Sequence, residues 1–163
     1  MMKVLQAVAL LAATMSMGLM AGVFGVYAHA IMPGLRRNGD RTFVSAFQEI
    51  DRAIVNPLFM VWFFGALAFS GTAAALLGGE RPVLPWVAGA LVLYLAVVAI
   101  TMAVHVPLND AIKAAGDGDP ALARERFDER RWAAWNVVRA LLSTAALGCL
   151  AWALVEYGRT VLG

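Results

Sequence analysis

Residues 101–139, TMAVHVPLNDAIKAAGDGDPALARERFDERRWAAWNVVR, decide how this chain is organised. They leave one apolar run through Val-His-Val-Pro-Leu-Asn-Asp, cross a charged stretch, and enter the next apolar run at Arg-Trp-Ala-Ala-Trp-Asn-Val-Val-Arg. Polar side chains gathered at the facing ends of two apolar runs need a physical reason, because a buried polar group is costly unless it is hydrogen-bonded. We therefore expect the functional residues here.

The composition is that of an integral membrane protein. Hydrophobic residues make up 61% of the 163 residues and charged residues 15%, whereas soluble domains have about 45–50% and about 25%. A net charge of +2, spread along the chain, does not predict a nucleic-acid surface. Cys149 lies in an apolar run and has no second cysteine with which to pair, so disulfides do not build this fold.

Apolar runs of about 20 residues or more predict membrane spans at about residues 4–31, 57–77, 83–106 and 132–155. The first is too long for a cleaved signal peptide, whose apolar part has roughly 7–15 residues. Pro57 is expected to open the second span, whereas Pro33-Gly34 and Pro107 are expected to end the first and third. The predicted fold is all-α: a single-domain, integral-membrane antiparallel four-helix bundle spanning residues 1–163.

The two longer connections carry most of the polar residues. Residues 42–54 predict a short amphipathic helix, and residues 110–131 are charged and mostly helical, with an interruption at 116–120 and a helix start at Asp119-Pro120. These connections also hold most of the lysine and arginine. The positive-inside rule therefore predicts that they are cytoplasmic and the termini outside, in a bacterial cytoplasmic membrane.

Because antiparallel helices alternate in direction, four span ends meet at one membrane face. On the third span, spacings of seven, four and four place Tyr94, Thr101, His105 and Asn109 on one stripe. On the fourth span, steps of one, three and four residues link Trp132, Trp135, Asn136 and Arg139. We expect these two stripes to face each other.

Arg139 lies about 10 Å beyond Trp132 along the helix, at or below the interface. An arginine at that depth costs a few kcal/mol, at least about 2.5, unless it snorkels to the headgroups, pairs, or lines a wet cavity. An inward guanidinium would hold an oxygen anion, or an amide carbonyl such as that of Asn109 or Asn136. Trp132 and Trp135 suit either interface anchors or the walls of a flat aromatic site.

His29 and His105, the only histidines, end neighbouring spans at one level. They suit three roles: hydrogen bonds between helices, general acid–base chemistry, or ligation of a haem or metal ion. The first connection adds Phe47, Gln48, Asp51 and Asn56. Asp51 becomes a candidate base if this helix covers the cavity, whereas Asn56 before Pro57 is typical of a helix cap.

Glycines at helical spacing on the first span let another helix approach closely, within the bundle or in an oligomer: Gly18, Gly22 and Gly25.

Four motifs carry a resemblance over nearly the whole chain: Gly22-Val-Phe to Met32-Pro33; Phe47-Gln-Glu-Ile-Asp51 with Val55-Asn-Pro57; Val106-Pro-Leu-Asn-Asp110; and Trp132-x-x-Trp-Asn136-x-x-Arg139. With them the chain resembles the anthrone-oxygenase-like family of small four-span membrane proteins. Similar sequences often carry asparagine in place of Asp51 and of His105. The resemblance therefore assigns no role to those two residues, and their candidate roles follow from the chemistry of a carboxylate and an imidazole.

The resemblance implies oxidation of anthrones to anthraquinones by O2 without a metal or flavin cofactor. Such a site needs a flat apolar slot, a base, and a hydrogen-bond donor for the enolate oxygen. Candidates are Trp132, Trp135 and Phe47 as walls; His105, His29 or Asp51 as base; and Arg139, Asn109 and Asn136 as oxyanion partners. Gln48, Asn56, Tyr94 and Thr101 complete the expected binding residues.

Two alternatives stay open. One is a membrane protein without catalytic activity that binds a lipid, a quinone or a partner subunit, with the polar cluster as a structural clasp. The other is a haem or metal protein with two histidine ligands. The expected surroundings in each case are the lipid bilayer and a small aromatic or lipid-like ligand, not a nucleic acid.

Overall fold

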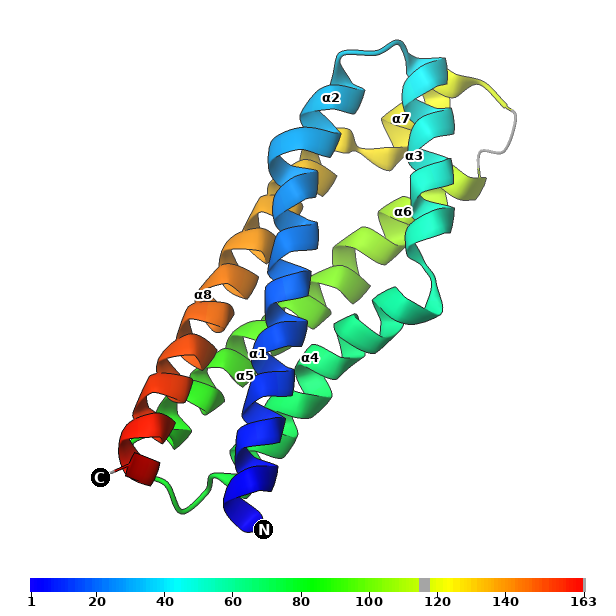
Figure 1. The fold of residues 1–163 in the computed structure, drawn as a ribbon. Coiled ribbons are helices and arrows are strands. Elements are labelled where there is room, and N and C mark those ends of the chain that lie inside the picture. The colour runs from blue at the N-terminus through cyan, green and yellow to red at the C-terminus, as the bar shows by residue number, and fades with distance from the viewer. Residues whose placement is uncertain (115–117, 163) are drawn as a thin grey trace.

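A computed structural model describes residues 1–114 and 118–162 of the chain. Four long helical segments run back and forth along one axis, with both termini at one end of the bundle and α3 (Asp40–Ile54) and α7 (Pro120–Phe127) at the other (Figure 1). Each is long and apolar enough to cross a membrane. No strand occurs among the described residues. The all-α membrane bundle predicted from the sequence is confirmed.

The first and third spans are longer than predicted. The first joins α1 (Met2–Val26), the π-helical turn η1 (Tyr27–Ile31) and α2 (Met32–Arg36), and the third joins α5 (Leu84–Ile100), η2 (Thr101–His105, also π-helical) and α6 (Val106–Ala114). The prediction that Pro33 and Pro107 end these spans is wrong. Each proline is the second residue of a new helical segment, where its missing N–H costs little.

The second and fourth spans are α4 (Pro57–Leu76) and α8 (Glu129–Leu162). Each helix contacts two neighbours, so that α1, α4, α5 and α8 form a ring in chain order. Small residues set two of the contacts. A Cβ on the buried Gly65 of α4 would lie 3.5 Å from Ser16 Oγ of α1, and one on Gly18 would lie 3.6 Å from Leu147 of α8. Gly22 and Gly25 have open space beside them.

Hydrogen bonds from buried side chains connect the spans. Tyr94, fully buried on α5, donates its hydroxyl proton to the carbonyl of Phe63 on α4 at 3.0 Å. At the end with the termini, Gln6 Nε2 donates to the carbonyl of Leu76 at 2.8 Å, and the Tyr157 hydroxyl donates to the carbonyl of Lys3 at 2.6 Å. These bonds satisfy polar atoms that lipid would leave without a partner.

An aromatic cluster closes the opposite end. The amphipathic helix α3 buries Phe43 and Phe47 against Phe127 of α7 and Trp132 of α8. The predicted helix start is confirmed, because Asp119 Oδ1 accepts a hydrogen bond from the backbone N–H of Ala121. Residues 116 and 117 of the predicted interruption lie outside the described part of the chain.

Arg124 connects three helices at this end. Its Nη1 lies 3.0 Å from Asp40 of α3, its Nη2 lies 2.6 Å from Glu129 of α8, and its guanidinium lies over the ring of Phe43, 4.2 Å from the centroid. Glu129 also pairs with Arg36 of α2. This network holds α3 over the end of the bundle.

Replacing Arg124 with alanine should therefore weaken the attachment of α3 to α7 and α8. We expect Arg124→Ala to lower the free energy of unfolding by about 1–2 kcal/mol and Tm by about 3–6 °C in detergent. Arg126→Ala, two residues along α7 from Arg124 and exposed, should leave Tm within about 1 °C. Equal effects of the two substitutions would show that the network does not hold α3.

Candidate functional site

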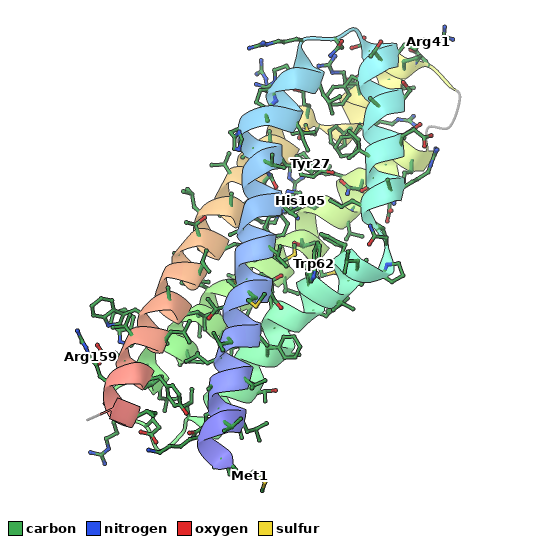
Figure 2. All side chains as sticks on the ribbon, in the orientation of Figure 1. Met1, Tyr27, Arg41, Trp62, His105 and Arg159 are labelled. Carbon is green, nitrogen blue, oxygen red and sulfur yellow. The ribbon has the colours of Figure 1, made fainter. Side chains whose placement is uncertain are left out.

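The two π-helical turns mark the level of the site. η1 and η2 both contact α8, and Tyr27 of η1 and His105 of η2 lie at nearly the same height in the bundle, near the end that carries α3 (Figure 2). A π turn inserts one residue into the helical register and is frequent at functional sites. Each ends two residues before a proline, Pro33 or Pro107.

A cavity of about 190 Å³ lies at this level. Helices α1, α3, α4 and α8 and the η2–α6 segment enclose it, and most of its lining is apolar. Its polar or aromatic lining residues are Phe24, Tyr27, Phe47, Asp51, Phe59, Phe63, Phe64, Thr101, His105, Asn109, Trp132 and Arg139. Residues far apart in the sequence therefore line one cavity.

Arg139 is the buried cation of this cavity and is only 6% exposed. Its Nη1 donates to Thr101 Oγ1 at 3.2 Å and its Nη2 to Asn136 Oδ1 at 2.9 Å. The guanidinium lies over the ring of Phe24, 4.4 Å from the centroid. Its Nε has no hydrogen-bond partner, and no ion pair among the described residues involves Arg139. The charge is thus held in place by neutral groups and keeps one donor free.

His105 is 2% exposed and also lines the cavity. The backbone groups of Ile100 and Trp132 lie close to its ring, but neither ring nitrogen makes a hydrogen bond of good geometry within the described residues. Its ring meets Trp132 edge-on, with centroids 5.0 Å apart. A buried imidazole without a well-formed hydrogen bond is costly for a purely structural residue, because nearly all buried polar atoms are paired.

A chain of hydrogen bonds runs along the edge of the cavity that α3 covers. Asp51, 6% exposed, pairs with Lys113 at 3.2 Å and accepts a hydrogen bond from Asn109 Nδ2 at 2.7 Å. Asn109 Oδ1 in turn accepts from the indole Nε1 of Trp132 at 2.7 Å. Asn109 therefore couples the carboxylate of α3 to the aromatic wall on α8.

Trp132 is the centre of that wall and is 3% exposed. Its ring contacts Tyr27 at 5.7 Å and Phe47 at 5.6 Å between centroids, and the Arg139 guanidinium lies 5.7 Å from its centroid. Tyr27 is a lining residue that the sequence analysis missed. Its position as the one tyrosine in the mostly apolar Gly22 to Met32-Pro33 motif was the available signal.

Six residues that the sequence analysis singled out do not line this cavity. His29 and Trp135 are exposed on the outer surface of their helices. Tyr94 binds the Phe63 carbonyl, Gln48 Nε2 donates to the Ile112 carbonyl at 2.7 Å, and Asn56 caps α4 through the N–H of Phe59. Asn136 is fully buried: its Nδ2 donates to the Phe24 carbonyl at 3.0 Å, and its Oδ1 accepts the hydrogen bond from Arg139 Nη2.

The two histidines therefore lie in different surroundings, His105 in the cavity and His29 on the outer surface. Within the described residues, no three His, Cys, Asp or Glu side chains are grouped as metal ligands would be. The side chains that meet in the cavity are instead a cation, an imidazole, an amide and a carboxylate with aromatic walls. This set suits proton transfer and stabilisation of an anion.

Comparison with known families agrees with this arrangement. The sequence model of the anthrone oxygenase family matches residues 59–149. The chain belongs to the anthrone oxygenase family. No curated protein and no solved structure matches it significantly.

The family match covers one part of the site. Thr101, His105, Asn109, Trp132 and Arg139 lie within the matched residues of this anthrone oxygenase family member, whereas Tyr27, Phe47 and Asp51 lie before them. The matched segment therefore supplies the guanidinium and the imidazole of the cavity, whereas the N-terminal span and α3 add aromatic walls and the Asp51 carboxylate.

Substitution of Arg139 separates a functional cation from a structural one. Arg139→Leu removes a buried charge that has no carboxylate partner, so we expect Tm in detergent to stay within about 2 °C of the wild type or to rise. Asn136→Leu, which removes the acceptor of Arg139 Nη2 and one of the donors to the Phe24 carbonyl, should instead cost about 1–3 kcal/mol. Loss of folded protein in Arg139→Leu would identify Arg139 as a structural clasp.

Proposed function

We propose that this protein is a membrane-embedded, cofactor-independent oxygenase that oxidises an anthrone-like or other acidic aromatic substrate with O2. One observation carries the proposal. A buried guanidinium with a free donor and an imidazole without a well-formed hydrogen bond line the same mostly apolar cavity, and they lie 5.7 Å and 5.0 Å, respectively, from the centroid of the Trp132 ring. Membership of the anthrone oxygenase family supports the choice of reaction.

The chemistry needs only a base and an anion-binding group. A base removes a proton from the CH2 group of the anthrone, which leaves an enolate whose charge rests largely on the carbonyl oxygen. The enolate passes one electron to O2, and the radical pair combines to form a C–O bond and, with a proton, a hydroperoxide. Loss of the remaining C–H proton and cleavage of the O–O bond release water and form the second carbonyl of the quinone.

Arg139 is the residue best placed to bind the enolate oxygen. Its interaction with developing charge is strong because the guanidinium is buried, and Thr101 and Asn136 fix its orientation before the substrate binds. Holding the enolate in this way lowers the barrier to removal of the first proton. Arg139 is therefore assigned to transition-state stabilisation.

His105 is the proposed base, since a neutral imidazole accepts a proton and neither of its nitrogens makes a well-formed hydrogen bond. Asp51 is less available to a substrate, because its two carboxylate oxygens are already engaged by Lys113 and Asn109. We assign Asp51 and Asn109 to positioning Trp132. Tyr27, Phe47 and Trp132 then form the walls against which an aromatic ring packs.

Emodin anthrone, incubated with purified protein under air and under argon, tests this function. We expect anthraquinone formation that requires both protein and O2, with one O2 consumed per quinone. His105→Gln and Arg139→Leu should each lower kcat by about 10²-fold or more. His29→Gln, outside the cavity, should stay within twofold of the wild type. Anthraquinone formation no faster than autoxidation would contradict the proposal.

The proposed orientation places α3 and α7 on the cytoplasmic side of a bacterial membrane, because most lysine and arginine lies in these connections. A cysteine at the exposed Arg41, in a Cys149→Ala background, should react with a membrane-impermeant maleimide in inverted vesicles and not in intact cells. The reverse pattern would place these connections outside.

A further inference from the structure

One side of the cavity is open. Four residues that line it are nevertheless well exposed: Val55 (55%), Phe64 (55%), Met102 (59%) and Val106 (38%). They come from the α3–α4 junction, from α4, and from the η2–α6 segment on the facing side. The opening therefore lies between α4 and η2.

The opening lies within the length of two candidate membrane spans. Phe64 lies seven residues, or about 10 Å, beyond Pro57 at the start of α4, and Met102 lies within the third membrane span. All four residues at the opening are apolar, as lipid-facing residues must be. Asp51 and Asn109, in contrast, lie on the side of the cavity that α3 covers. The cavity thus has one polar and one lipid-facing end.

The cavity is small for a three-ring substrate. An apolar protein cavity of about 150 Å³ holds a benzene molecule, so about 190 Å³ has room for a head of one or two fused rings. A third ring or a chain has to pass through the opening. Two flexible methionines, Met60 and Met102, line the cavity near this side and can adapt to what passes.

We propose that the substrate is a lipid-dissolved, amphipathic aromatic molecule. Its oxygen-bearing head, one or two fused rings in size, binds against Arg139 and His105, and its apolar remainder extends between α4 and η2 into the bilayer. The same opening is the route by which it arrives from the membrane. The inference rests on the proposed function for the oxidation of the head, and it adds to that function the class of molecule that serves as substrate.

Two probes test it in wild-type protein reconstituted in lipid nanodiscs: 2-hydroxy-1,4-naphthoquinone, an acidic two-ring head, and its 3-octyl derivative. Met102→Trp places a large side chain at the opening. Val92→Trp is the matched control, since Val92 is 65% exposed on α5 and does not line the cavity. Binding is measured by titration calorimetry, which requires no turnover.

We expect the wild type to bind both compounds. Met102→Trp should raise the dissociation constant of the octyl derivative at least tenfold and leave that of the parent compound within threefold of the wild-type value. Val92→Trp should change neither. Equal effects of Met102→Trp on both compounds, no effect on either, or no binding of either to the wild type would overturn the inference. Oxidation of emodin anthrone by a wild type that fails this test would leave the proposed function standing.

Discussion

The guanidinium of Arg139 lies inside an apolar bundle with a hydroxyl, an amide and aromatic faces around it and no carboxylate to neutralise it. Placing a charge in such surroundings costs free energy, and much of the neighbouring structure reduces that cost. Asn136 connects Arg139 to the Phe24 carbonyl, and Thr101 approaches from η2. One donor, Nε, stays free, and a bound oxygen anion would complete its hydrogen bonding.

Both π-helical turns serve this arrangement. η1 places Tyr27 and η2 places Thr101 and His105 on the cavity, while α8 supplies Trp132 and Arg139 between them. Helix α3 then covers the site with Phe47 and Asp51. The cavity is polar on the side where α3 and α6 meet and apolar where α4 and η2 diverge, which suits a molecule that is itself polar at one end.

Much of the fold follows from local patterns. Long apolar runs predict the spans, and Asp119-Pro120 predicts the start of α7. Apolar residues at helical spacing, with polar residues on the opposite face, predict α3. The depth of Arg139 in its span follows from counting residues along a regular helix. These features depend on neighbours in sequence, so a single chain contains enough information to predict them.

The directions of several side chains do not follow in this way. His29 continues the face of Gly22 and Gly25, which has open space beside it, whereas Tyr27 follows the buried Phe24 by three residues. Only the packing of the bundle shows which of these two faces turns inward. Trp135 is next to Asn136 yet exposed, because adjacent helix positions differ by about 100° around the axis. The bond between Asp51 and Asn109 joins residues far apart in the chain, and only the packing of α3 brings them together.

The central claim is that Arg139 binds an oxygen anion on an aromatic ring. The most direct test compares the dissociation constants of 2-hydroxy-1,4-naphthoquinone, ionised at neutral pH, and neutral 2-methyl-1,4-naphthoquinone for the wild type and Arg139→Leu. The account predicts that the wild type prefers the anion at least tenfold, about 1.4 kcal/mol, and that Arg139→Leu loses this preference. The same preference in both proteins would contradict it.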